Sequence, residues 1–443
     1  MLLNGTNGWQ IYSMQNKPQT LCLAPWVHTY LSPQTERRMC CASREPAQNF
    51  EQYIDTKAGT GTYIPITLEA HWNSDHMKSV RKRMMAGETL PECEVCNDKL
   101  LNTSVYRSYF DSMFGHKYLQ VLENTAPDGS TTLRPVSWDY RFSNLCNFKC
   151  RMCGDMLSSA WESEQRQHNM INWVDPKNSW MKPEIKKHIT EFQDNQIERE
   201  FAEAVEQHRI EEVYWVGGEP LMYEQHWRYM QRIVELGDGK NVYARYNTNL
   251  SRINYRGINL YNDILARLRD WQICASLDGT GPIGEYIRTG LDYNSWLENF
   301  RQGVARSTHR RQVRIDFTLT LPGMFELENI ACLAQEEGVD ILAKVVFSFS
   351  PDIIMSPLAL PKELLHPWVD ELLNISLPDS LREILIQLKT RPTFQEQWPN
   401  EWQTALDKGK QRVLQLEHIR KDQYTLADIL STRPEVYEWY QSI

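Results

Sequence analysis

Six β-rich runs alternate with helix-like segments between residues 134 and 350, and this alternation constrains the fold more than any other feature. Enough chain separates consecutive runs for a crossover helix, which parallel strands need. Repeated strand–helix units of this kind predict an α/β fold with a parallel sheet. The runs are PVSWDYRFS (135–143), EEVYWVGG (211–218), NVYARYNTN (241–249), WQICASLDG (271–279), QVRIDFTLTLPG (312–323) and DILAKVVFSF (340–349).

The fifth run separates an apolar face from a polar one, because its side chains alternate between the two sides of a strand. The polar face carries Arg314, Asp316 and Thr318. A closed eight-stranded barrel usually fills its interior with branched apolar side chains. Polar stripes on successive strands therefore favour a wide or open barrel whose wet lumen holds a ligand, and a sheet with one solvated face is the alternative.

Asp316 is a candidate catalytic residue on this inward face. A buried aspartate beside Arg314 would be held ionised, and it could orient a polar substrate group or accept its proton. The alternative is that Arg314 and Asp316 only satisfy one another inside the barrel.

The charge balance of the 443-residue chain argues against a sequence-independent grip on nucleic acid. Lys and Arg number 48 against 57 Asp and Glu, which gives a net charge of −9, and phosphate neutralisation needs the opposite sign. No run approaches about 18 uninterrupted apolar residues, and the first residues lack a basic segment followed by an apolar one. We therefore expect a cytoplasmic protein without a membrane span.

Three cysteines, Cys146, Cys150 and Cys153, follow the first β-rich run with the spacing C-x3-C-x2-C. Three thiolates on one loop can hold a 4Fe–4S cluster and leave one of its four irons open. A structural zinc site would need a fourth ligand, and the next histidine, His168, is fifteen residues further on. The spacing alone leaves both metals open and favours the cluster.

Further motifs follow the later runs. The second run ends in GGEP (Gly217–Pro220), where two glycines allow a ligand close to the backbone and a carboxylate can meet an amino group. The fourth run ends in SLDG, and Arg288 follows in EYIRTG. Together with the cysteine loop, this constellation resembles the radical S-adenosylmethionine (radical SAM) superfamily over about residues 134–350.

The resemblance implies a partial (β/α)6 barrel in which Cys146, Cys150 and Cys153 hold a 4Fe–4S cluster. The open iron would chelate the amino and carboxylate groups of S-adenosylmethionine. Met152 stands where the superfamily most often has an aromatic residue against the adenine, and methionine can make a similar soft contact. The implied cofactor-binding residues are Gly217, Gly218, Glu219, Pro220, Asn249, Ser276, Asp278, Arg288 and Met152.

The segment before the barrel contains a second set of cysteines: Cys22, Cys40, Cys41, Cys93 and Cys96. By count, four thiolates fit a second Fe–S cluster or a tetrahedral zinc equally well, and either Cys40 or Cys41 could be the fourth ligand. The layout is similar to the twitch or SPASM-like auxiliary-cluster regions of radical SAM proteins, which favours the cluster. We expect this region at residues 1–133, the barrel at 134–350 and a helical extension at 351–443.

The resemblance implies an enzyme that reductively cleaves S-adenosylmethionine and abstracts hydrogen from a substrate, foremost a peptide or protein side chain. It also implies an electron donor such as flavodoxin or ferredoxin. Radical chemistry on a nucleotide or cofactor precursor is the second enzyme hypothesis. A zinc-organised scaffold without catalysis is the alternative from another class.

Overall fold

One eight-stranded sheet organises the molecule. The computed structural model describes residues 17–44, 65–97, 105–346 and 352–443. The first residues of the chain and the end of the sixth β-rich run therefore lie outside the described residues. The strands are β1 (His28–Leu31), β2 (Arg37–Arg38), β3 (Ser137–Tyr140), β4 (Glu212–Trp215), β5 (Tyr243–Thr248), β8 (Asp270–Ser276), β9 (Val313–Leu319) and β10 (Asp340–Val345).

Six of these strands are parallel and adjacent in chain order, as the sequence predicts. The sheet runs β10-β9-β8-β5-β4-β3-β1-β2, and every pair from β3 to β10 is parallel. In the described residues no strand pairing joins β10 to β2, so the sheet stays open. The prediction of an α/β fold built as a partial (β/α)6 barrel is confirmed.

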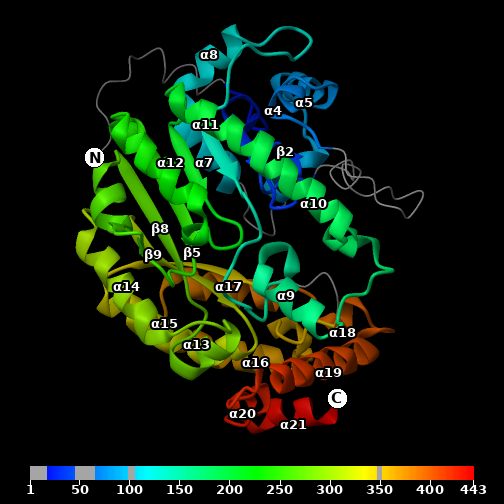
Figure 1. Cartoon of the computed structure of the whole chain (residues 1–443). Coiled ribbons are helices and arrows are strands. Elements are labelled where there is room, and N and C mark those ends of the chain that lie inside the picture. The colour runs from blue at the N-terminus through cyan, green and yellow to red at the C-terminus, as the bar shows by residue number, and fades with distance from the viewer. Residues whose placement is uncertain (1–16, 45–64, 98–104, 347–351) are drawn as a thin grey trace.

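Helices cover the outer face of this sheet (Figure 1). The barrel helices pack apolar side chains against the outward residues of the strands, in one continuous core. A small hairpin, β6 (Asn254–Tyr255) with β7 (Ile258–Asn259), interrupts the crossover between β5 and β8. The barrel helices are α9 (Ser159–Gln167), α10 (Pro183–Phe192), α11 (Glu198–Glu206), α12 (Glu224–Glu235), α13 (Gly281–Ile287), α14 (Tyr293–Arg306) and α15 (Leu327–Glu336).

The inner face of the sheet is polar and only partly accessible to solvent, since Ser137, Asp139 and Asp316 are buried. Along β5, Ala244 and Tyr246 on the outer face are buried, whereas Arg245 and Asn247 on the inner face are only half-buried. This alternation is expected where helices cover one face and a water-filled lumen meets the other.

The N-terminal region contributes two strands that the sequence analysis missed. β1 pairs in parallel with β3, and β2 returns antiparallel to β1. β1 is buried throughout, so its sequence HTYL shows no alternation, and β2 is only two residues long. The helices of this region are α2 (Ala24–Val27), α4 (Leu68–Trp72), α5 (Asp75–Met85), α6 (Glu94–Asn97), α7 (Val105–Phe114) and α8 (Tyr118–Glu123).

The C-terminal region is helical, as predicted. Helix α17 packs against β10, and α19 to α21 gather at one end of the molecule next to α9 (Figure 1). None of the described helices combines the length and apolar character that crossing a membrane requires. The helices are α16 (Lys362–Leu373), α17 (Asp379–Thr390), α18 (Phe394–Gln397), α19 (Trp402–Arg420), α20 (Leu426–Leu430) and α21 (Pro434–Ser442).

Candidate functional site

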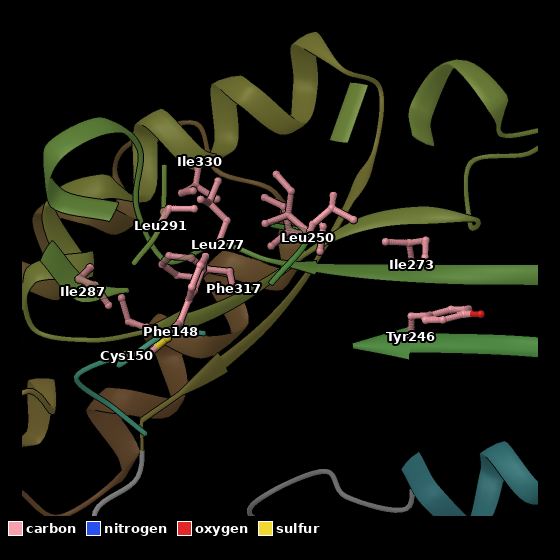
Figure 2. Close-up of a cluster of buried hydrophobic side chains, with 14 of the residues drawn as sticks. Phe148, Cys150, Tyr246, Leu250, Ile273, Leu277, Ile287, Leu291, Phe317 and Ile330 are labelled. Atoms are coloured by element: carbon pink, nitrogen blue, oxygen red, sulfur yellow. The ribbon is translucent and has the colours of Figure 1, made fainter. Parts of the chain in front are cut away.

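The three-cysteine loop lies beyond the carboxyl end of β3, where it is fastened to the segment after α13. The backbone N–H of Lys149 donates to the carbonyl of Thr289 (2.8 Å), and that of Arg151 donates to the carbonyl of Ile287 (2.8 Å). Phe148 and Cys150 enter the same apolar cluster as Ile287 (Figure 2). The loop therefore has a fixed backbone before any metal binds.

The thiols of the loop have N–H neighbours of the kind that surround metal thiolates. The Phe148 N–H donates to Sγ of Cys146 (3.4 Å), and Nη1 of Arg288 lies 3.9 Å from Sγ of Cys150. Burial raises the pKa of the Cys150 thiol to about 12, and Arg288 acts in the opposite direction. A bare thiol here is protonated at neutral pH, so a bound metal cation is needed to stabilise the thiolate.

The donor set fits a cluster held by three cysteines. Cys150 is buried, while Cys146 and Cys153 are half-buried and pack at the edge of the core. Among the described residues no three Cys, His, Asp or Glu side chains already converge at the spacing of metal ligands. The assignment of Cys146, Cys150 and Cys153 as ligands therefore stays a prediction from the spacing of the loop.

The Gly217–Pro220 motif packs directly against the cysteine loop. Gly217 and Gly218 have φ values of +80° and +54°, which glycine adopts without strain. A Cβ at Gly218 would lie 2.5 Å from the carbonyl oxygen of Leu145, and the Glu219 N–H donates to that same oxygen (2.7 Å). Close contact with the start of the loop thus requires glycine here, and Pro220 opens the following short helical turn.

Glu219 is buried at the rim of the barrel, and three donors hold its carboxylate. They are the backbone N–H of Asn249 (2.6 Å), the Thr248 hydroxyl (2.7 Å) and the backbone N–H of Leu221 (3.0 Å). Burial raises the pKa of Glu219 to about 7, while these hydrogen bonds lower it. A cationic amino group beside Glu219 would favour the ionised form.

Asn249 joins Glu219 to the cysteine loop. Its side-chain amide donates to Oδ1 of Asn147 (3.0 Å) and lies 4.0 Å from Sγ of Cys146. Thr248 was not among the sequence candidates, although its position beside Asn249 at the end of a strand could have indicated it.

Asp278 and Arg288 form a buried ion pair on the other side of the loop. Nε of Arg288 lies 2.7 Å from Oδ2 of Asp278, whose other oxygen accepts from the Thr318 N–H (2.7 Å). Asp278 therefore orients Arg288. Ser276 is the last residue of β8 and is half-buried. Met152 is half-buried beside Cys153 and packs against the core.

The C-terminal extension also holds the cysteine loop, through contacts that local sequence patterns cannot show. Arg420, at the end of α19, pairs with Glu164 of α9 (2.8 Å), and both side chains are buried. Nη1 of Arg420 also donates to the carbonyl of Lys149 (3.0 Å) and the hydroxyl of Thr289 (3.0 Å). A single guanidinium thus joins the two segments that fasten the loop.

Changing Arg420 to Gln is expected to lower the free energy of unfolding by about 1.5–3 kcal/mol, because it removes charge-assisted hydrogen bonds between buried groups. Lys149 remains as a cation beside Glu164. The control is Arg433→Gln, in the same extension, because its partner Glu371 is exposed. Loss of an exposed pair should cost at most about 1 kcal/mol. Urea unfolding followed by circular dichroism measures both, and equal small losses would contradict the role of Arg420.

The partner expected for Asp316 was wrong. Asp316 is buried on the inner face of β9, but its carboxylate accepts from Nζ of Lys344 (3.0 Å to each oxygen) and from the Asn247 amide (2.6 Å). Arg314 instead donates from Nε to Sγ of Cys274 (3.1 Å). Side chains two residues apart on a strand are about 7 Å apart, whereas neighbouring strands are about 4.8 Å apart, so partners come from the adjacent strands.

The N-terminal cysteines separate into a group of four and one other. Cys22, Cys40, Cys93 and Cys96 line one small cavity. Burial raises the pKa of Cys22 to about 12 and that of Cys93 to about 11. Burial also raises the pKa of Cys40, so the thiols of Cys22, Cys40 and Cys93 would need a bound cation to be stable as thiolates. By number, the four thiols fit an Fe–S cluster or zinc.

Cys41 is oriented toward the barrel. Its charged neighbours are Asp139, Arg141 and Arg245, and its thiol hydrogen-bonds with the Tyr106 side chain. The chain turns here, with the Ser43 N–H donating to the Cys40 carbonyl (3.1 Å), and Cys40 and Cys41 face different surroundings. The geometry favours Cys40 over Cys41 as the fourth thiol of the group.

The two thiol groups lie at opposite ends of the strands. β1 runs parallel to β3 from His28 to Leu31, with Cys22 just before its amino end, and antiparallel β2 returns Cys40 to that end. The cysteine loop follows the carboxyl end of β3. The polar lumen lies between the two groups.

One rim of the open parallel barrel carries both the three-cysteine loop and the Gly-Gly-Glu motif. This combination indicates the class of protein, and a family model matches it. Residues 140–328 match the family model of the Radical SAM superfamily. The chain therefore contains a radical SAM domain over these residues. No curated protein sequence matches the chain.

Solved structures that resemble the chain include two of SuiB from Streptococcus suis. The SuiB complex with the precursor peptide SuiA is 16% identical, with 54% of this chain and 46% of SuiB aligned and a TM-score of 0.32. The SuiB complex with S-adenosylmethionine is 14% identical, with 56% and 47% aligned and a TM-score of 0.32. The alignments thus span about half of SuiB. TYW1 with a lysine–pyruvate adduct is 14% identical, with 54% and 69% aligned and a TM-score of 0.28.

Proposed function

We propose that the chain is a radical SAM enzyme that abstracts hydrogen from a peptide or protein side chain. A reduced 4Fe–4S cluster with bound S-adenosylmethionine supplies a 5′-deoxyadenosyl radical. The observation that carries the proposal is the packing of the Cys146–Cys153 loop against Gly217–Glu219 on one side and Arg288 on the other. Polar, half-buried side chains on the inner face of the sheet, Arg245 and Asn247 among them, support a polar substrate.

Different residues of the chain bind the metal and bind and orient S-adenosylmethionine. Cys146, Cys150 and Cys153 hold the metal, while buried Glu219 receives the amino group of S-adenosylmethionine. Arg288, oriented by Asp278, and Ser276 meet its carboxylate or ribose. Gly217 and Gly218 let the cofactor approach the backbone, and Met152 supplies a soft apolar contact. Fixing these groups before reaction aims one substrate hydrogen at the radical.

The N-terminal region, residues 1–133, is proposed to hold an auxiliary Fe–S cluster through Cys22, Cys40, Cys93 and Cys96. The barrel would occupy residues 134–350 and the helical extension 351–443. A reduced flavodoxin or ferredoxin would supply the electron. The lining of a single cavity by four thiols supports a metal at this site.

Metal analysis tests both proposed clusters. Protein reconstituted anaerobically should bind about eight irons per chain if both sites hold 4Fe–4S clusters. Changing Cys146, Cys150 and Cys153 to Ala should remove about half of this iron, because only one thiol group is altered. Iron is quantified by mass spectrometry together with visible absorbance.

The metal analysis has two informative contrary results. About four irons with stoichiometric zinc that survives the triple substitution would assign the N-terminal thiols to zinc. Iron content that the triple substitution leaves unchanged would contradict the proposed radical SAM site.

Asp316→Asn tests whether the lumen carboxylate acts on substrate. The substitution roughly keeps the size of the side chain but removes its charge, and Lys344 is half exposed and remains solvated. Product that depends on substrate should fall at least about 100-fold, as expected when a proton-transfer group is lost. Cluster content and cleavage of S-adenosylmethionine without substrate should stay unchanged.

The measurement is anaerobic mass analysis after incubation with S-adenosylmethionine, reductant and host extract. Asp340→Asn is the control, because Asp340 is exposed and pairs only with exposed Arg310 among the described residues. If Asp316→Asn loses folded protein or cluster in proportion to product, the carboxylate has a structural role.

A further inference from the structure

Two arginines on the inner face of the sheet lack a close carboxylate partner among the described residues. Asp139 pairs with Arg141 (3.1 Å), and Asp316 pairs with Lys344 (3.0 Å). The remaining lumen cations are Arg245 and Arg314. Among the described residues neither has a hydrogen bond to a carboxylate.

Arg245 is held in place without being neutralised by a close carboxylate. Its guanidinium lies over the ring of Tyr214 (3.8 Å to the centroid) and over that of Tyr109 (4.3 Å). Its nearest carboxylate oxygen, on Glu212, is 3.7 Å away. Nε of Arg245 is buried and has no hydrogen-bond partner within the described part of the chain.

Glu212 is already occupied by other donors. Its carboxylate accepts from the Ser137 hydroxyl (2.5 Å) and from the Tyr109 hydroxyl. It therefore cannot turn to Arg245 without losing these bonds, and an unsatisfied buried donor costs free energy unless a ligand completes it.

Arg314 lies on the other side of β8. Its one described hydrogen bond joins Nε to Sγ of Cys274, which leaves its Nη groups available. Both Arg314 and Arg245 act electrostatically on the Cys274 thiol, which β8 places between them. Two guanidiniums thus lie near the same buried thiol, one on each side of β8.

The field of Arg245 extends to His28 of β1. The pKa of His28 is lowered to about 3, first by burial and then by Arg245 and Arg141. His28 is therefore neutral and does not add to the positive charge. An anion placed here would gain charge-assisted hydrogen bonds without displacing the Asp139–Arg141 or Asp316–Lys344 pairs.

We propose that Arg245 and Arg314 form a binding site for an anionic oxygen group of the substrate, a carboxylate or a phosphate. Guanidinium is suited to such groups, because its planar donors match their oxygens. Naming this group as part of the substrate rests on the proposed function. Binding of an anion by the two arginines does not.

The position of the site also sets the distance between the anionic group of the substrate and its reacting carbon. Arg314 and Thr318 are four residues apart on β9, which corresponds to about 13 Å along a strand. Thr318 lies at the rim, where its N–H bonds Asp278, the partner of Arg288. A substrate would therefore carry its anionic group about 13 Å from the carbon that reacts.

Titration calorimetry and crystallography with two probes test the site in the reconstituted full chain. Tungstate represents a phosphate and p-bromobenzoate a carboxylate, and both scatter anomalously. The preferred probe should bind with its anomalous peak between Arg245 and Arg314. Arg314→Gln and Arg245→Gln should each weaken binding at least about tenfold, because a charge-assisted contact is lost.

Arg314→Lys, which keeps the charge, should retain part of the affinity, and Arg310→Gln, an exposed control, should retain all of it. Whichever probe binds more tightly identifies the class of anion. Absence of a lumen peak with both probes, or equal binding by the Gln variants in folded protein, would overturn the proposal. 5′-Deoxyadenosine formation is measured on the same preparations. Cleavage of S-adenosylmethionine without anion binding refutes the anion site alone. Anion binding without cleavage of S-adenosylmethionine refutes the radical function alone.

Discussion

Replacing Cys150 with alanine is expected to abolish the formation of 5′-deoxyadenosine from S-adenosylmethionine. Cys150 is the buried member of the loop, and its backbone carbonyl accepts from the Trp161 indole N–H (2.8 Å). Two remaining thiols leave the proposed cluster one ligand short, and solvent reaches it poorly from this side. Wild-type protein should cleave S-adenosylmethionine slowly even without substrate, because three ligands leave one iron open.

The reaction is followed anaerobically with dithionite as reductant, and 5′-deoxyadenosine is quantified by chromatography and mass spectrometry. Cys332→Ala is the matched control, because Cys332 is an exposed cysteine on α15, outside both thiol groups. It should leave the rate unchanged. Equal rates in Cys150→Ala and wild type, or no product from fully loaded wild type, would refute the radical assignment.

The six parallel strands could be predicted because the pattern that indicates each strand lies within its own few residues. In β9 the outward residues Val313, Ile315 and Phe317 are all buried in the core, and Asp316 lies on the opposite, inner face. Period-two alternation survives where one face meets helices and the other meets a wet lumen. The same alternation is absent from the buried strand β1, which sequence reasoning missed.

The alternation assigned residues to a face, but it could not assign their partners. Asp316 finds Lys344 on β10, and Arg314 finds Cys274 on β8. Those pairings depend on which strands are neighbours and on their register, which arise only when the sheet assembles. The inference about Arg245 and Arg314 depends on the same assembled arrangement.

Contacts distant in sequence account for the rest of the site. Arg420 donates to the carbonyl of Lys149 across 271 positions of the chain. From the N-terminal region, α7 places Tyr109 against Arg245 of the barrel. The sequence predicted a helical extension that includes α19, and it did not predict α7. No local pattern states which loop a helix end will contact.

The adjacent cysteines Cys40 and Cys41 give the sharpest test of the N-terminal metal site. Cys40 lines the cavity that Cys22, Cys93 and Cys96 also line, whereas Cys41 hydrogen-bonds with Tyr106 and faces Asp139. Cys40→Ser should therefore remove the auxiliary metal, about four irons for a 4Fe–4S cluster. Cys41→Ser should retain it.

The two variants differ by one position and share the same change of sulfur to oxygen, so each controls for the other. Metal is quantified by mass spectrometry after anaerobic reconstitution, and the result is equally clear if the metal is zinc, because a tetrahedral zinc site also needs its fourth thiolate. The iron held by Cys146, Cys150 and Cys153 should persist in both variants, since that loop lies at the other end of the strands. Loss of metal in Cys41→Ser with retention in Cys40→Ser would reverse the assignment and place Cys41, rather than Cys40, at the auxiliary site. Retention in both would show that neither thiol is required there.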